Sequence, residues 1–293
     1  MLTVISVLIV NYNGEKYIKD TLVSCVNAFE KQSFCEYEIL VLDNASGDNS
    51  VAQIELADAE IKSRNIKIFK SNDNMGFAKG CNYLAQYASG QILYLLNNDT
   101  HSIDLTELIY LIRNNQFKNN SLWALKTLNK DSTRQNNVFT YPSRLKLVIE
   151  MLLLKNFIYK FKTNIFRKEN EDLGRKYFSG CALLISKETF LNVGGFDESF
   201  YFYHEECDLF LNIQYKFKNA VDKRLLSDEL IHFGGGGGVI SEYSFIAYYT
   251  NLYRLYFKHS LFSRDFLDFL FKMSFFIKKI LFKMKINYSY SPF

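Results

Sequence analysis

The chain has 293 residues, a net charge of +4 at pH 7 and 48% apolar residues, a composition that supplies a full core and excludes global disorder. Its five cysteines are scattered and lack CxxC spacing, which indicates reduced cysteines rather than a disulfide framework or a zinc site. Segments 144–168 and 254–293 each carry a net charge of +6, which leaves −8 for the remainder. Because a nucleic-acid cleft should itself be basic, this acidic body with two basic patches predicts no nucleic-acid partner and favours contact with an anionic surface.

The beginning of the chain shows no targeting pattern. A strand-like run, Val4–Val10, starts almost at once, without a basic leader or a small-residue cleavage site. No uninterrupted apolar run approaches the roughly 18 residues that a membrane span needs. We therefore expect a cytoplasmic protein.

Strands and helices alternate along the first hundred residues. The sequence predicts strands at Val4–Val10, Tyr37–Leu42, Ile66–Phe69 and Ile92–Leu96, and helices at Tyr17–Phe29, Ser50–Ser63, Ala78–Ala88 and Asp104–Asn114. Alternation at this spacing predicts βαβ units, and hence an α/β fold with a mostly parallel central sheet covered by helices on both faces.

The first two strands end in polar loops. Asn11-Tyr12-Asn13-Gly14 follows the first strand, where a dinucleotide-binding enzyme would need GxGxxG, so that class is disfavoured. Asp43 ends the second strand, where a carboxylate can accept hydrogen bonds from a nucleoside. A solvated turn with a Ser-Gly-Asp tip is the alternative reading of this loop.

The strand Ile92–Leu96 ends in Asn97, Asn98 and Asp99. Ligands of open α/β sheets lie outside the carboxyl ends of the strands, so Asp99 is expected at a binding crevice. A carboxylate there can hold Mg²⁺ or Mn²⁺, ions that usually take few protein ligands and complete their shell with substrate phosphates. The alternative is a turn that merely caps the next helix.

After residue 114 the pattern loosens. Residues 115–143 are predicted to be irregular, Arg144–Phe166 a basic helical hairpin or lid, Cys181–Ser186 a strand and Lys187–Val193 a helix. Phe257–Phe282 places Leu, Ile and Phe at helical spacing among lysines and arginines, which predicts a basic amphipathic tail.

An acidic cluster, Glu205, Glu206 and Asp208, precedes a predicted helix at Leu209–Ile213. The helix dipole alone would favour carboxylates at this place. Three carboxylates within four residues also repel one another, which should raise the pKa of at least one and suits a general base.

Six blocks of this sequence together resemble the family 2 glycosyltransferases with a GT-A fold, in particular their bacterial rhamnosyltransferase-like branch. The resemblance covers roughly residues 4–255, with every block after the right kind of element. The blocks are Val7–Asn13, Val41–Asp48, Asn74–Asn82, Leu95–Asp99, Gly194–Glu198 and Glu205–Leu209, followed by His232 before a glycine run.

The resemblance implies a role for each matching residue. Asn11 and Asn13 would line the nucleotide pocket, and Asp43 would bind the base. The loop beside the ribose and sugar would be shaped by Asn74, Gly76 and Asn82. The triplet Asn97-Asn98-Asp99 would replace the family's Asp-x-Asp, with Asp99 as the metal carboxylate and Asn97 standing where many members have an acid.

The resemblance also implies roles in the second half. Glu206 would be the catalytic base, one methylene longer than the more usual Asp, so Glu205 and Asp208 stay as candidates. His232 would be a further metal or diphosphate ligand, since Gly234–Gly238 lets backbone N–H groups approach a phosphate closely.

The function implied is an inverting, metal-dependent glycosyltransferase of bacterial surface polysaccharide synthesis. Its donor would be a dTDP- or UDP-sugar, with rhamnose as the first expectation, and its acceptor a glycan or a polyprenyl-linked molecule. We divide the chain into a nucleotide-sugar half (1–120), an acceptor and base half (121–255) and the tail (256–293). The tail is expected on the inner face of the cell membrane, or packed on the protein's own body or a second subunit in a homodimer.

Two other functions stay open from the residues. A non-catalytic sugar-nucleotide or glycan-binding protein at the membrane is supported only by Asn97. A nucleotidyltransferase shares metal carboxylates at strand ends, but would need a glycine-rich, basic phosphate loop after the first strand. Residues 11–14 offer none.

Overall fold

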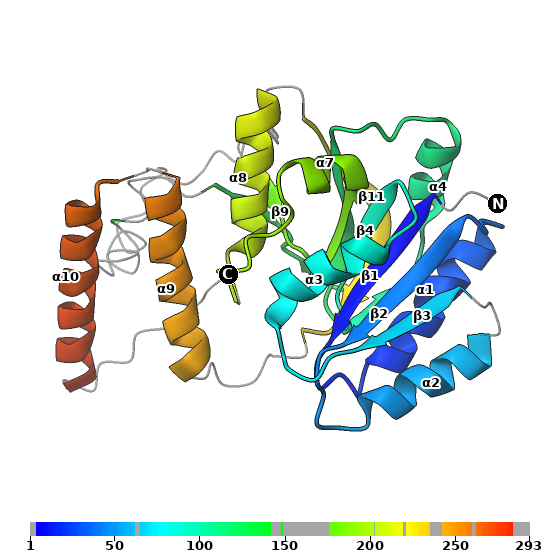
Figure 1. Ribbon diagram of the computed structural model, residues 1–293, viewed down its shortest axis with the longest axis horizontal. Coiled ribbons are helices and arrows are strands. Elements are labelled where there is room, and N and C mark those ends of the chain that lie inside the picture. The colour runs from blue at the N-terminus through cyan, green and yellow to red at the C-terminus, as the bar shows by residue number, and fades with distance from the viewer. Residues whose placement is uncertain are drawn as a thin grey trace.

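The computed structural model describes residues 4–61, 65–141, 148, 176–201, 203–218, 221–234, 242–259 and 262–283. One curled sheet forms the body, and two further helices lie at one end of it (Figure 1). The predicted hairpin or lid at Arg144–Phe166 lies outside the described residues, except for Val148. No helix in the described part of the chain is both long enough and apolar enough to cross a membrane.

The first half of the sheet is parallel, as predicted. Its strands lie in the order β3-β2-β1-β4, and every neighbouring pair among them is parallel. The connecting helices are α1, α2 and α3, which return the chain between successive strands. The elements are β1 (Ile5–Asn11), α1 (Ile18–Lys31), β2 (Tyr37–Asp43), α2 (Ser50–Ile61), β3 (Ile66–Lys70), α3 (Gly76–Tyr87) and β4 (Ile92–Leu96).

The second half of the sheet is mixed. Beyond β4 the order is β10-β6-β11-β5; β10 is antiparallel to both of its neighbours, and β11 is parallel to β6 and antiparallel to β5. The strands are β5 (Thr100–Ser102), β6 (Ser121–Leu128), β10 (Ala182–Ser186) and β11 (Asp222–His232), with β7 (Arg134–Gln135) paired to β6 and a separate small sheet of β8 (Val138–Thr140) and β9 (Lys176–Phe178). The prediction of irregular structure over 115–143 is wrong, because β6 is a buried inner strand.

Helices cover both faces of the sheet. One face packs against α1, α2 and α4 (Thr106–Arg113), and the other against α3, α7 (Lys187–Asn192) and α8 (Glu205–Phe217) (Figure 1). In β1, Val7 and Ile9 face the first group while Leu8 faces the second, as alternation along a strand requires. The prediction of an α/β sheet covered on both faces is confirmed.

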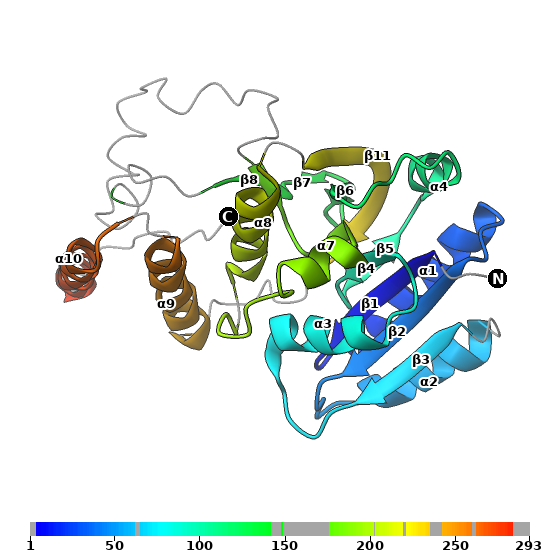
Figure 2. The ribbon, with the colours of Figure 1, turned by 45° about the horizontal axis from the view of Figure 1, so that its top comes forward.

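The last two helices, α9 (Glu242–Lys258) and α10 (Arg264–Lys283), pack against each other through an aromatic core of their own. In both views α8 lies between α9 and the sheet (Figures 1 and 2). The described part of the C-terminal tail, which ends at Lys283, is therefore largely helical as expected, although the boundary drawn at residue 256 falls inside α9. Both the 1–120 and the 121–255 segments contribute strands to the same sheet, so their division by function stays a prediction.

Candidate active site

The carboxyl ends of β1, β2 and β4 meet at a buried polar network. Asn11 and Asp43 are register partners, and Nδ2 of Asn11 donates to Oδ1 of Asp43 over 3.0 Å. Asn98 donates its Nδ2 to Oδ1 of Asn11 over 2.8 Å. The backbone N–H of Ser46 donates to the other oxygen of Asp43. Because each carboxylate oxygen can accept two hydrogen bonds, Asp43 is held in place and still has capacity for a ligand.

The loop after β1 is built tightly on this network. Asn13 has a φ of +49°, and its Oδ1 accepts the N–H of Gly47 over 2.9 Å. A side chain at Gly14 would collide with Asn11 and Asn98, since its Cβ would lie 2.2 Å from Oδ1 of Asn11. The glycine therefore permits the close approach on which the network depends.

The loop before α3 brings a distant segment to the same side of the sheet. Oδ1 of Asn74 accepts from Nδ2 of Asn44 over 2.9 Å and from the N–H of Gly76. Gly76 has a φ of +80°, and a Cβ there would lie 3.0 Å from the ring of Tyr201. The sequence motif pointed to Asn74 and Gly76, but not to their contact with the loop before α8.

Asn82 lies on α3 and is bound by protein groups. Its Nδ2 donates to the carbonyl of Phe196 over 2.9 Å, and its Oδ1 accepts the N–H of the same residue over 2.9 Å. Nδ2 also lies 3.2 Å from a carboxylate oxygen of Glu198. The side chain therefore fastens α3 to the Gly194–Glu198 loop, and any contact with a sugar would be additional to this structural task.

Asp99 and His232 lie together at the end of the mixed half of the sheet. Pairing of β5 with β11 sets Thr100 opposite His232, and Nε2 of His232 lies 3.3 Å from Oδ1 of Asp99 and 3.3 Å from Nδ2 of Asn97. Nδ1 of His232 lies 2.8 Å from Oε1 of Gln135. The tautomer that donates from Nδ1 to Gln135 can accept at Nε2 from Nδ2 of Asn97, and the same nitrogen could serve as a metal ligand.

These groups fit a divalent cation that takes only part of its shell from the protein. No cluster of three or more His, Cys, Asp or Glu side chains close enough to hold a metal occurs in the described residues. One carboxylate and one imidazole, oriented through Gln135, are a suitable partial set if a diphosphate supplies further oxygens. Of the predicted glycine run, only Gly234 is described, with a φ of +60° and an open surrounding; Gly235–Gly238 lie outside the described residues.

The acidic cluster forms the first turn of α8. Oε1 of Glu206 accepts the backbone N–H of Gly180 over 3.1 Å. Burial raises the pKa of Glu206, even though this hydrogen bond favours the ionised form. Glu205 is more deeply buried, and in the described part of the chain its Oε2 has no hydrogen-bond partner. Burial, and then the charge of Glu206, raise the pKa of Glu205 well above its usual range.

Asp208 is bound by a different set of groups from this pair of glutamates. Its side chain is fully buried and accepts hydrogen bonds from Asn212, Lys258 and His259. The sequence pattern did not single out Lys258 or His259 for this contact, nor did it find Gln135 and Gly180. All four contact their partners through tertiary structure that no local motif encodes.

The comparisons with known proteins come from both sequence and structure. The pattern of Glycosyl transferase family 2 matches residues 6–177. An uncharacterized glycosyltransferase of Haemophilus influenzae is 24% identical over 175 residues, which are 58% of this chain and 65% of the relative. The matches to curated Haemophilus influenzae relatives span less than two thirds of those proteins' own lengths.

Two solved structures show the same fold at low sequence identity. S. aureus TarS 1-349 in complex with UDP has a TM-score of 0.58 and 16% identity, with 92% of this chain and 69% of that chain covered. Mannosyltransferase PcManGT from Pyrobaculum calidifontis, in complex with GDP-Man and Mn2+, has a TM-score of 0.57 and 12% identity, with 95% and 75% covered. The fold is thus that of the GT-A glycosyltransferases, and the family match over more than half of its length shows that the chain belongs to glycosyl transferase family 2.

Proposed function

We propose that the protein is an inverting glycosyltransferase that moves a sugar from a nucleoside diphosphate donor to an acceptor hydroxyl. The observation that carries this proposal is the backbone link between its two polar clusters. Cys181 accepts the N–H of Asn97 through its carbonyl over 3.0 Å, and the preceding Gly180 donates to Glu206. Adjacent residues therefore connect the strand-end triplet to the acidic turn. A donor at the triplet and a base at the turn would then be neighbours.

The donor would lie across the ends of β1, β2 and β4. Asn11 and the N–H of Ser46 hold Asp43, whose remaining lone pairs suit the donor groups of a uracil or thymine base. Asn13 and the Asn74–Gly76 loop would border the ribose and sugar. The family resemblance favours a UDP- or dTDP-sugar, with rhamnose as the first candidate. TarS has been seen with UDP and with UDP-GlcNAc, and PcManGT with GDP-Man.

Asp99 and His232 would hold Mg²⁺ or Mn²⁺, with Asn97 beside them. When bound, the cation would neutralise charge that develops on the leaving diphosphate. The structure of PcManGT is in complex with GDP-Man and Mn2+, and that of GalNAc-T7 is with UDP, GalNAc and Mn2+, which supports the same class of ion here.

Glu206 would accept the proton of the acceptor hydroxyl while that oxygen forms a bond to the anomeric carbon. The bond to the diphosphate breaks on the opposite side, so one displacement inverts the configuration. A raised pKa brings a carboxylate closer to the pH at which proton transfer is most effective. Glu205 and Asp208 are less suited as bases, because one is the more deeply buried and the other is bound by Lys258 and His259.

The acceptor would be a glycan or a polyprenyl-linked molecule at the inner face of the cell membrane, within bacterial surface polysaccharide synthesis. Support comes from α10, where Phe266, Phe269, Met273 and Phe276 are exposed along one side of the helix. Lys272 is exposed beside them. An amphipathic surface of this kind favours a bilayer interface.

Thermal stabilisation by a panel of nucleotide sugars tests donor and cation together. UDP-, dTDP- and GDP-sugars are each added with Mg²⁺, with Mn²⁺ or with EDTA. A ligand at about 100 times its Kd adds about 2.7 kcal/mol of stability, which shifts Tm by several degrees. We expect one class of donor to shift Tm and EDTA to remove most of the shift. No shift with any nucleotide sugar would contradict the proposal. Once a donor is identified, its transfer to a synthetic acceptor would establish the anomeric configuration of the product.

A further inference from the structure

The buried carboxylate of Asp208 is tied to the end of α9. Nε2 of His259 lies 2.8 Å from its Oδ1, and Nζ of Lys258 lies 2.8 Å from its Oδ2. Asn212, one turn later on α8, donates to the same Oδ2 over 3.0 Å. Asp208 stands two residues after Glu206, so these contacts fix the first turn of the helix that carries the proposed base.

Lys258 connects a second carboxylate to the same cluster. Its Nζ lies 2.7 Å from Oδ2 of Asp197, in the loop before α8. Burial opposes ionisation of Asp197, but hydrogen bonds from Lys258 and Ser199 outweigh it and lower its pKa to about 2. The pKa of Lys258 is raised in turn, because the two carboxylates outweigh the effect of its burial. A buried charge without such pairing would be strongly destabilising, so the cluster holds its members together.

Earlier residues of α9 contact the segment between Asp197 and Glu205. Arg254 donates to the carbonyl of Ser199, and Asn251 to that of Tyr203 over 3.4 Å. The ring of His204 lies 4.6 Å from that of Tyr248. Contacts with this segment therefore recur along α9, up to Lys258 at its end.

The segment is conformationally strained where it enters α8. Tyr203 and His204 have φ values of +71° and +70°, a left-handed conformation that bulky residues rarely adopt. Such strain persists only where surrounding contacts impose it. Here those contacts come from α9, and the next two residues are Glu205 and Glu206.

We propose that the end of α9, through Lys258 and His259, positions the turn that carries Glu206, and that Asp208 is a positioning residue for that turn. This inference rests on the proposed function for the identity of the base. The mechanical part does not depend on it, because a loosened turn is measurable in the absence of any substrate.

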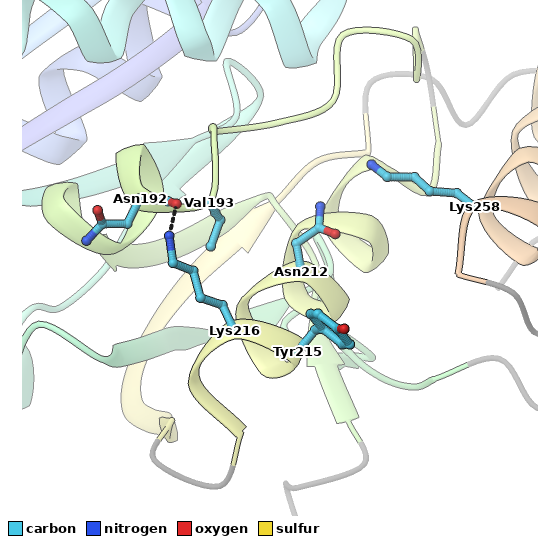
Figure 3. Close-up of a pocket in the computed structure, with 6 residues that line it drawn as sticks. All are labelled: Asn192, Val193, Asn212, Tyr215, Lys216 and Lys258. Carbon is cyan, nitrogen blue, oxygen red and sulfur yellow. Dashed lines mark hydrogen bonds between the residues drawn. The ribbon is translucent and has the colours of Figure 1, made fainter.

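Lys258 offers a substitution with a matched control. Lys258→Met keeps an unbranched side chain, one atom shorter, and removes its charge, whereas Lys258→Arg keeps the charge. Lys216→Met is the control: Lys216 lies on α8, donates to the carbonyl of Asn192, and borders with Lys258 the same surface hollow of about 500 Å³ (Figure 3). The readouts are hydrogen exchange of the intact protein and, once a donor is identified, kcat and KM.

We expect Lys258→Met to raise amide exchange at 203–207 by about tenfold or more, with β1 and β2 unchanged. It should lower kcat by about tenfold or more and change the donor KM by less than about twofold. Lys258→Arg should keep amide exchange and kcat close to their wild-type values, and Lys216→Met should change neither. Unchanged exchange and unchanged kcat in Lys258→Met would overturn the proposal, as would a loss confined to donor KM.

Two substitutions at His259 test the same contact if Lys258→Met does not fold. His259→Phe removes the donor to Asp208, and His259→Gln retains one. The proposal requires the first to loosen the turn and the second to preserve it; equal exchange in both would overturn it. A wild-type protein that transfers no sugar while the exchange pattern holds would contradict the proposed function and leave the positioning of the turn established.

Discussion

Gly180 donates its backbone N–H to Oε1 of Glu206 across 3.1 Å. The next residue, Cys181, holds Asn97 through its carbonyl oxygen, so residues more than a hundred positions apart in the sequence are connected through one peptide segment. This arrangement arises because β10 is inserted next to β4. One peptide segment therefore connects the strand-end triplet to the acidic turn, through a backbone hydrogen bond at Asn97 and a backbone-to-carboxylate hydrogen bond at Glu206.

Replacing Glu206 with Gln should separate catalysis from binding. The amide keeps the size of the side chain but removes its basicity, so we expect turnover to fall by about 10²-fold or more while donor binding is retained. Steady-state kinetics and thermal shift with the donor measure the two effects. Glu205→Gln is the matched comparison on the neighbouring residue. Full activity in Glu206→Gln would contradict the assignment of the base, and an inactive Glu205→Gln would move it to Glu205.

Gly180→Ala should disturb the base without touching the donor site. A Cβ at this position would lie 3.1 Å from both Cγ and Oε1 of Glu206, close enough to displace the carboxylate. We expect a fall in kcat of about tenfold with little change in donor KM. The double variant with Glu206→Gln gives the control: if the alanine acts through Glu206, the combined loss should not exceed that of Glu206→Gln alone. Additive losses would contradict this explanation.

The two glutamates predict a specific dependence on pH. Burial raises the pKa of both, and a base must be ionised, so kcat should rise with pH through the raised value for Glu206. The free energy of unfolding should instead fall as pH rises. The folded protein holds these protons more tightly than the unfolded chain, so their contribution is present below the ordinary glutamate value of 4.5 and is lost as pH rises through the raised pKa.

Glu205→Gln tests the stability part. Removing one of the two carboxyl groups should raise Tm at about pH 8 more than at about pH 5, because the ionised form of the buried pair is no longer formed. Thermal unfolding across this range measures the difference. A variant that follows the wild-type pH dependence in parallel would show that Glu205 carries no shifted proton.

Asp99→Asn should weaken the affinity of the enzyme for a divalent cation. The change keeps one oxygen and removes the negative charge, so the Mn²⁺ concentration for half-maximal effect should rise by about tenfold or more and turnover should fall. Titration of Mn²⁺ in the presence of the donor nucleotide measures this by thermal shift. Asp20→Asn, an exposed carboxylate paired with His101, is the control. Identical cation titrations of Asp99→Asn and wild type would remove the role proposed for Asp99.

The local sequence was sufficient to predict a strand where a short apolar run has clear polar ends. The strand Ile92–Leu96 was predicted with its observed bounds, because five apolar residues end sharply in a polar triplet. Residues 115–143 were predicted to be irregular because most of this stretch is polar, and its short apolar run was not taken as a strand. In β6, residues 121–125 are all buried. The run Leu122–Leu125 was the signal for this strand.

The site needed tertiary information at several points. The sequence motifs pointed to Asp99, His232 and Glu206, but nothing local indicates that Gln135 orients His232. The same is true of Lys258 and Asp208, whose contact depends on how α9 packs on α8. Charge density within four residues suggested that Glu205, Glu206 and Asp208 share one environment. The structure keeps Glu205 and Glu206 together, since the charge of Glu206 contributes to the raised pKa of Glu205. Asp208 differs from both because Lys258 and His259 bind its carboxylate.

The exposed face of α10 should bind an anionic bilayer. Leu267, Leu270 and Phe271 of this helix are buried in the cluster that it shares with α9, so deleting the tail would also expose α9 and confuse the result. Point substitutions on the outer face are cleaner. Phe269 and Phe276 are 59% and 62% exposed, and changing both to Ser should remove apolar area without disturbing that cluster.

We expect wild-type protein to float with vesicles that contain phosphatidylglycerol and not with pure phosphatidylcholine. Each basic residue near such a surface contributes about 1 kcal/mol, so binding should weaken steeply with salt. The Phe269→Ser, Phe276→Ser variant should bind about tenfold more weakly or worse, because it loses apolar contact area. Tyr110→Ser, which removes an aromatic side chain that is 62% exposed on α4, should bind as wild type does. If the double variant floats unchanged, the face is not a membrane surface. If instead wild type is a dimer in solution and the double variant is a monomer, the face pairs with a second copy of the chain.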